Sequence, residues 1–226
     1  MSLVLHYHPL SSFSQKVATA LYENGAPFEA RIVDLMDPAA RAEYLKLSPM
    51  GKIPILQDGE RAIVETSVQI EYLDRRYPGR HPLLPADPEA RLEARLWDRL
   101  FDLYVEVPMQ KIVSDRLRPV GEHDPRGVAD ARAGLKSAYT MIDAHMAGRT
   151  WAAGDGFSIA DCAAAPGLLF AGVIEPFDAH AHLAAYFERL LARPSYRRAL
   201  AEAQPFLQYF PFYDAMPVRF RDWERG

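Results

Sequence analysis

The sequence predicts a small α/β domain followed by an all-α domain, and three observations carry this prediction. Strand and helix patterns alternate over the first 77 residues. Strand patterns then stop, and only helical spacing of apolar residues follows. Between the two regions lies Tyr77-Pro-Gly-Arg-His-Pro-Leu-Leu-Pro-Ala-Asp-Pro88, whose four prolines and lack of a helical period are typical of a linker. We therefore expect one domain over residues 1–80 and a second over residues 89–226.

The first region contains four strand patterns and three helix patterns. Strands show alternating apolar residues. The first two helices are stopped by Gly25 and by Ser48-Pro49, and the pair Asp58-Gly59 forms a tight turn between two strands. In chain order we expect a strand over 3–8, a helix over 15–24, a strand over 28–35, a helix over 39–47, strands over 53–57 and 61–65, and a helix over 66–77. The order β-α-β-α-β-β-α indicates a small mixed sheet with helices packed on it.

The second region is predicted to be helical throughout. Apolar residues recur at helical spacing in two long stretches, and two further stretches, 159–170 and 181–191, also read as helices. The recurring residues are Leu92, Leu96, Leu100 and Leu103 in one stretch and Leu135, Tyr139, Ile142 and Met146 in the other.

Composition excludes several classes of function. The net charge of −4 and the interleaving of basic with acidic residues argue against a nucleic-acid partner. The single cysteine, Cys162, rules out an intramolecular disulfide and fits a reducing cytoplasm. No histidine pair has metal-ligand spacing, so we expect no metal. The N-terminus lacks the pattern of a secretory signal and no apolar run could span a membrane, so we expect a cytoplasmic protein with no membrane partner.

Three serines stand at the junction between the first strand and the first helix. Ser12 and Gln15 have the spacing of a capping box, in which each side chain satisfies a free backbone N–H. Ser14 would then lie on the first helical turn, and Ser11 would have no capping task. A hydroxyl beside a helix N-terminus can donate a hydrogen bond to a thiolate or an oxyanion. The residues alone leave open whether Ser11 has this role.

Two further segments can bind a ligand or have a purely structural role. Proline cannot donate to a sheet, so Pro54 either opens a strand as an ordinary trans residue or is cis. A cis bond would offer the main chain of Ile53 to an extended peptide. Glu65 and Thr66 precede a helix, where they could hold the ammonium and carboxylate of an amino-acid head or could serve only as caps.

The second region has its own motifs, which we interpret structurally. Ser158 and Asp161 form a second capping box, and Cys162 follows among alanines as a buried small side chain. The aromatic segment 206–213 is expected to pack against the helices or to wall an apolar pocket.

Four segments together resemble the cytosolic glutathione transferase superfamily over nearly the whole chain. They are Ser11-Ser-Phe-Ser-Gln-Lys-Val17, Ser48-Pro-Met-Gly-Lys-Ile-Pro-Ile-Leu56, Glu65-Thr-Ser-Val-Gln-Ile-Glu-Tyr-Leu73 and Gly154-Asp-Gly-Phe-Ser-Ile-Ala-Asp161. The resemblance implies a thioredoxin-like first domain that binds glutathione as co-substrate, and a helical domain that contributes the pocket for a small hydrophobic electrophile. It also implies a homodimer.

The resemblance assigns roles to individual residues. It implies that Ser11 is the catalytic hydroxyl, with Ser12 as the fallback. It implies a cis Pro54, pairing of the Ile53 main chain with the cysteinyl part of glutathione, and binding of the γ-glutamyl head by Glu65 and Thr66. Lys52 is a candidate for the glycine carboxylate. For the walls of the electrophile pocket, the candidates are Phe13, Tyr104 and Met109.

Two alternatives to a conjugating transferase remain at this stage. The serine-rich segment partly resembles the zeta class, which isomerises maleylacetoacetate, and the same thiolate could serve a reductive dehalogenase. That class has cysteine, tryptophan and arginine where this chain has Phe13, Gln15 and Lys16. The other alternative is a protein that kept the fold and binds glutathione, or acts as a scaffold, without turnover.

Overall fold

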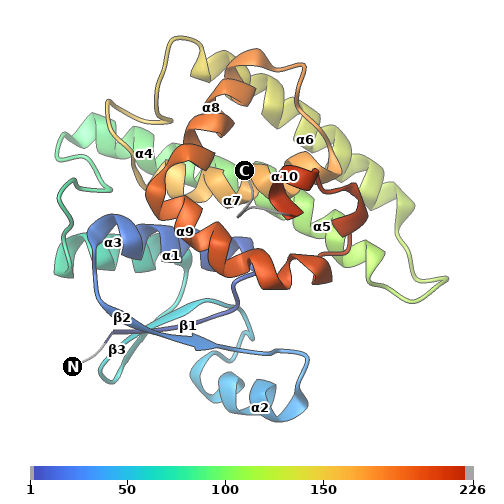
Figure 1. Ribbon diagram of the computed structural model, residues 1–226, viewed down its shortest axis with the longest axis horizontal. Helices are drawn as coiled ribbons and strands as arrows, with labels where there is room; N and C mark the ends of the chain where they lie inside the picture. Colours follow the sequence, from blue (N-terminus) through green and yellow to red (C-terminus); the bar gives the residue numbers. More distant parts are fainter. Residues whose placement is uncertain (1–2, 222–226) are drawn as a thin grey trace.

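The computed structural model describes residues 3–221 (Figure 1). Residues 3–76, called the first half below, form a four-stranded mixed sheet with three helices, and residues 88–221 form the second half. The elements of the first half follow the predicted order, and the strand order in the sheet is β2-β1-β3-β4. They are β1 (Leu3–Tyr7), α1 (Ser12–Asn24), β2 (Phe28–Ile32), α2 (Pro38–Leu47), β3 (Ile55–Asp58), β4 (Arg61–Ile63) and α3 (Thr66–Arg76). The sheet runs parallel between β1 and β2 and antiparallel from β1 to β3 to β4.

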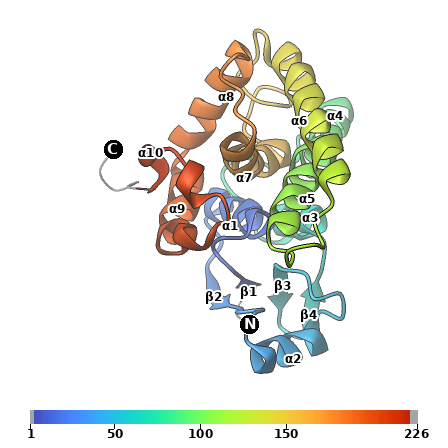
Figure 2. The same ribbon diagram turned by 90° about the vertical axis from the view of Figure 1, so that its right-hand side faces the viewer.

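The sheet separates α2 from the other two helices of this half. Figure 2 shows α1 and α3 above the sheet and α2 below it. The central strand β1 is almost wholly buried, whereas β2 is an exposed edge strand. Between α2 and the sheet lies a small apolar cluster of Val33, Tyr44 and Ile55, separate from the main core.

The ends of these elements follow from local residue chemistry. Gly25 ends α1 in the left-handed conformation, with φ 61°, which glycine adopts without steric cost. Asp37 caps α2 through a hydrogen bond from the Ala39 N–H to its side chain, and Pro38 occupies the first helical position. The two strands predicted over 28–35 and 61–65 end earlier, at Ile32 and Ile63.

Within the described residues, every regular element of the second half is a helix, as predicted. It contains α4 (Pro88–Phe101), a π-helical segment η1 (Asp102–Glu106), α5 (Val107–Arg116), α6 (Pro125–Met146), α7 (Ile159–Ile174), α8 (Ala181–Ala192), α9 (Pro194–Ala203), the 3-10 segments η2 (Gln204–Tyr209) and η3 (Tyr213–Ala215), and α10 (Val218–Arg221). None of the helices within residues 3–221 is both long enough and apolar enough to cross a membrane.

Helix α7 lies at the centre of the second half and is buried on every side. The predicted capping box at its start is confirmed, since the Ser158 and Asp161 side chains each bond the other's backbone N–H. Cys162 is fully buried and free, as expected. The Asp161 carboxylate also accepts hydrogen bonds from the Ala152 N–H and the Tyr186 hydroxyl, so it fixes three segments at once.

One continuous apolar core joins the two halves. Helix α1 packs against the sheet and α3 on one side and against α7 and α9 on the other. The core cluster therefore runs from Leu3 and Leu5 of β1 through Leu21 of α1 to Leu168 of α7. The linker adds a direct bond, because the Ile159 N–H at the start of α7 donates to the Leu83 carbonyl.

Candidate functional site

Three segments with candidate site residues meet at one edge of the sheet. The carboxyl end of β1 pairs with the amino end of β3, with His6 opposite Ile55. The carboxyl end of β4 reaches the same edge, because Ile63 pairs with Leu56. Pro54 directly precedes β3, while Ser11 follows β1 and Glu65 follows β4 by a few residues. The N-termini of α1 and α3 therefore face the same region, and each carries the partial positive charge of a helix start (Figure 2).

The capping residue of α1 is Ser11, so the predicted capping box between Ser12 and Gln15 is wrong. Ser11 has extended backbone angles, φ −74° and ψ 121°, and its Oγ accepts from the Ser14 N–H at 3.3 Å. Gln15 instead donates from Nε2 to the Pro9 carbonyl at 2.9 Å. The helix starts one residue earlier than the capping-box pattern suggests, because the Ser11 N–H already closes a turn onto the His8 carbonyl.

The two neighbouring serines therefore differ in what their hydroxyl groups can do. Capping uses a lone pair of the Ser11 oxygen, so the hydroxyl hydrogen of the half-buried Ser11 can still be donated to a ligand. Ser12 is 5% exposed, and its hydroxyl donates to Oε2 of Glu106 at 2.8 Å. The single hydrogen of Ser12 is thus already committed inside the protein.

The loop before β3 is fixed by hydrogen bonds on both sides of Ile53. The Ile53–Pro54 peptide bond is cis, as the family resemblance implied. The Lys52 carbonyl accepts from the Tyr44 hydroxyl at 2.7 Å, and Nε2 of Gln69 donates to the Pro54 carbonyl at 2.8 Å. The main chain of Ile53 is therefore held in place between two anchored carbonyls. The side chain of Lys52 is exposed.

Glu65 is the only non-glycine residue with positive φ among residues 3–221. It has φ 64° and ψ 116° at the N-cap of α3, and its exposed side chain makes no capping hydrogen bond. Such a conformation costs about 1–3 kcal/mol and tends to occur at functional sites. Thr66, the first residue of α3, is 9% exposed. The arrangement leaves the carboxylate of Glu65 free beside the N–H groups of a helix start.

A buried cluster of charges joins α1 to α4, and the sequence analysis missed it. Nζ of Lys16 lies 2.7 Å from Oδ1 of Asp98 and 2.9 Å from Oδ2 of Asp102, with all three side chains almost fully buried. Burial by itself would lower the pKa of Lys16, but the two carboxylates outweigh it and raise that pKa. Ser67 of α3 donates to Asp98 at 2.5 Å, so the cluster also reaches the second helix of the site.

Glu106 was also missed, although the spacing gave a signal. Asp98, Asp102 and Glu106 follow one another at four-residue intervals, one residue after the core positions of Trp97, Phe101 and Val105. Three acids on such a face are in position to be buried with it. Burial raises the pKa of the Glu106 carboxyl to about 8, and the hydrogen bond from Ser12 opposes this rise. At neutral pH the carboxyl is therefore mostly protonated.

The three residues predicted to wall the electrophile pocket lie in different surroundings. Phe13 is half-buried on the first turn of α1, Tyr104 is 54% exposed on η1, and Met109 is 4% exposed within the helical core. The pocket-wall assignment stays a prediction.

The aromatic segment 206–213 approaches the site from the second half of the chain. The Phe206 ring meets the His8 ring edge-on at 4.9 Å, and the Arg116 guanidinium lies 4.7 Å from the centre of the Phe212 ring. Leu207 and Phe210 are buried, so the expectation that this segment packs against the helices is confirmed. Its contact with His8 brings it close to the turn that precedes Ser11.

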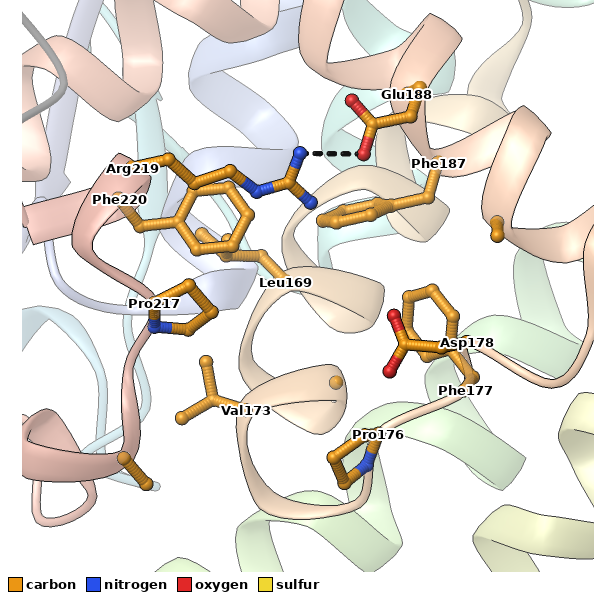
Figure 3. A pocket seen from close by; sticks show the side chains of 13 residues that line it. Leu169, Val173, Pro176, Phe177, Asp178, Phe187, Glu188, Pro217, Arg219 and Phe220 are labelled. Carbon is orange, nitrogen blue, oxygen red and sulfur yellow. Dashed lines mark hydrogen bonds and ion pairs between the residues drawn. The ribbon is translucent and has the colours of Figure 1, made fainter. Parts of the chain in front are cut away.

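Two cavities among the described residues do not include the candidate site residues Ser11, Pro54 and Glu65. One, of about 170 Å³, is lined by α7, α8 and the C-terminal segment, and an ion pair of 2.7 Å between Arg219 and Glu188 borders it (Figure 3). The other, of about 350 Å³, lies between β2 and α2 beside Tyr44. Within the described part of the chain, no group of histidine, cysteine and acidic side chains could hold a metal ion.

Comparison with known families identifies the family to which this chain belongs. The N-terminal domain of glutathione S-transferases matches residues 5–81, and the C-terminal domain of the same family matches residues 101–194. The chain belongs to the glutathione S-transferase family. The thioredoxin-like first half and the helical second half are the two halves of this fold.

Relatives of this glutathione S-transferase family member include both enzymes and a protein named for its location. Glutathione S-transferase 3 of Zea mays is 31% identical over 208 residues, covering 88% of this chain and 93% of that protein. FtsZ-localized protein A of Caulobacter vibrioides is 30% identical, covering 93% and 96%. A solved glutathione S-transferase of Methylobacterium radiotolerans, in complex with glutathione sulfonate, has a TM-score of 0.78 at 27% identity and covers 88% of this chain and 94% of that one.

Proposed function

We propose that the protein conjugates glutathione to small hydrophobic electrophiles through a thiolate that Ser11 stabilises. The observation that carries the proposal is the state of the Ser11 hydroxyl. It caps α1 as an acceptor from the Ser14 N–H, so its own hydrogen remains available at a helix N-terminus. Membership of the family indicates glutathione as the co-substrate, since solved relatives were obtained with glutathione or its analogue bound.

The chemistry of the proposed step follows from the pKa of the thiol. A free thiol titrates near ~8.5, so at neutral pH it is mostly protonated and a poor nucleophile. A hydroxyl that donates to the sulfur, together with the positive end of the α1 dipole, favours the thiolate. The thiolate then attacks the electrophile, a carbon–sulfur bond forms, and the leaving group departs with its electron pair.

The remaining residues at the edge would hold the peptide in register. The main chain of Ile53, beside the cis peptide bond, pairs with the cysteinyl part of glutathione. The α-carboxylate of the γ-glutamyl head binds Thr66 and the N–H groups of α3, and its ammonium binds the free carboxylate of Glu65. The exposed Lys52 is the proposed partner of the glycine carboxylate.

We also propose a homodimer formed through α3 and α4. Large apolar side chains are exposed on both helices, including Val68 at 54%, Leu92 at 62% and Leu96 at 53%. An ion pair of 2.8 Å between Arg95 and Glu71 joins the two helices. A second copy would cover these apolar side chains, as the family resemblance implies.

Turnover of a chlorodinitrobenzene-type substrate tests the role of Ser11. A hydrogen bond to a charged group contributes about 1.5–3 kcal/mol, so Ser11→Ala should lower kcat/KM by about 10- to 150-fold. Ser195→Ala, which removes a hydroxyl near the far end of α1, is the comparison and should leave kcat/KM unchanged. Activity of Ser11→Ala equal to that of the wild type would refute the assignment.

One observation favours a second function, glutathione binding without turnover. The relative that covers 93% of this chain at 30% identity is named for localization to FtsZ and not for a transferase activity. Calorimetry with glutathione, followed by a panel of electrophiles, separates the two. Micromolar binding with no turnover of any substrate would favour the second function. Turnover of maleylacetoacetate in place of conjugation would instead indicate a zeta-like isomerase.

A further inference from the structure

The first turns of α1 are held by side chains from the second half of the chain. Ser12 donates to Glu106 at 2.8 Å, and Lys16 bonds Asp102 at 2.9 Å. From α9, the Tyr196 hydroxyl lies 3.4 Å from Oε1 of Gln15, a longer contact. Ser11 directly precedes these anchored residues, so its location depends on groups about 90 residues further along the chain.

Glu106 is the anchor nearest to Ser11, and it is enclosed on two sides. Its side chain is 1% exposed between α1 and α7. On the α7 side is Gly167, where an added Cβ would come within 3.3 Å of Oε1 of Glu106. Glu106 also ends the π-helical segment η1. Such segments are rare and occur frequently at functional sites, because the added residue changes where the side chains of the following turn point.

We propose that Glu106 is a positioning residue for Ser11, which it places by holding the Ser12 hydroxyl and with it the first turn of α1. The inference rests on the proposed function, in which Ser11 donates to the thiolate of glutathione. Glu106 itself does not touch the ligand in this scheme. The charged and titratable groups around it are Asp102 on η1, Lys16 on α1 and Tyr196 on α9. Lys16 is paired with two aspartates, so Ser12 is the group that meets Glu106 directly.

Ser12→Ala should impair activation of the glutathione thiol but leave the binding of glutathione nearly unchanged. Ser12→Ala removes the donor, and the first turn of α1 loses its bond to the helical half. A misplacement of a catalytic group by about 1 Å can lower a rate by about 100-fold. We therefore expect kcat to fall by about 10- to 100-fold and the pKa of the bound glutathione thiol to rise. The dissociation constant of glutathione should change by less than about 3-fold, because the other contacts of the peptide lie on β3 and α3.

Two variants at position 106 and one matched control complete the experiment. Glu106→Gln keeps an oxygen that accepts from Ser12, so it should retain the wild-type thiol pKa, whereas Glu106→Leu should behave as Ser12→Ala does. Ser195→Ala is the control, since the Ser195 hydroxyl donates to Glu23 and so also joins α9 of the second half to α1, but at the far end of that helix. It should leave the thiol pKa and kcat unchanged.

The readouts are the ultraviolet absorbance of the bound thiolate as a function of pH and hydrogen exchange of the Ser14 amide, which bonds the Ser11 side chain. We expect Ser12→Ala to raise the thiol pKa and to speed exchange of this amide, with Ser195→Ala changing neither. Unchanged exchange and an unchanged thiol pKa in Ser12→Ala would overturn the inference. If the wild type binds no glutathione, the proposed function fails, and the exchange measurement still decides whether Ser12 and Glu106 hold Ser11.

Discussion

Replacing Glu106 with glutamine should change how the stability of the protein depends on pH. In the folded protein the carboxyl is wholly buried and accepts one hydrogen bond, from Ser12. Burial raises its pKa from 4.5 to about 8. The folded protein therefore retains a proton that the unfolded chain releases above the lower value. Glutamine carries no such proton, so the variant lacks this contribution.

The sign and size follow from proton linkage. Between the unfolded and the folded pKa the folded state binds more protons, so the free energy of unfolding of the wild type falls as pH rises. The slope is about 1.4 kcal/mol per pH unit for one group, which gives roughly 4 kcal/mol between pH 5 and pH 8. The stability of Glu106→Gln relative to the wild type should thus rise by this amount over that range. Any fixed cost of burying the amide cancels, because it does not change with pH.

Urea unfolding at four pH values between 5 and 8 measures this difference, provided that the two proteins have equal m-values. The same substitution at the exposed Glu60, on the turn between β3 and β4, is the control and should give a difference that does not vary with pH. A difference for Glu106→Gln that stays constant within about 1 kcal/mol would refute the reasoning, because it would mean that the buried carboxyl is ionised in the folded protein.

Three further substitutions test other parts of the structure. Lys16→Met should lower the free energy of unfolding by about 3–5 kcal/mol, because Asp98 and Asp102 lose their buried cation; a loss below about 1 kcal/mol in urea would contradict this. Glu65→Gly should leave the free energy of unfolding unchanged or raise it by at most about 1 kcal/mol, since glycine adopts φ 64° freely. Calorimetry should show that the variant binds glutathione at least about 10-fold more weakly, and unchanged affinity would remove Glu65 from the site. Leu96→Glu should convert the proposed dimer to monomers in sedimentation, and a dimer that persists would exclude the α3–α4 surface.

The sequence was sufficient for the order of elements because each signal was local. Alternating and helical periods identified the strands and helices up to residue 77, and Gly25 and the prolines of the linker ended them. Helix α9 was not identified, although Pro194 directly after α8 is a signal for a helix start. The early ends of β2 and β4 reflect where each strand loses its partner, which is a property of the sheet.

The errors at the site have a common cause in tertiary contacts. Two serines at the start of α1 could each cap it, and local spacing favoured Ser12. The outcome was set by the turn from His8 to Ser11 and by Glu106, which binds the Ser12 hydroxyl from 94 positions away. Glu106 escaped notice for the same reason, since an acid on an amphipathic helix usually faces water. Burial of that acid depends on α1 being packed against it.

The bonds between α1 and the second half also limit how this protein can be recombined with its relatives. Lys16 has its two carboxylate partners on α4 and η1, and Glu23 at the other end of α1 is paired with Arg193 at 2.7 Å. A chimera that joins this first half to the helical half of another family member would bury Lys16 without those partners unless they are transferred too. Crossovers in the linker should therefore succeed with donors that carry acids at the positions of Asp98 and Asp102.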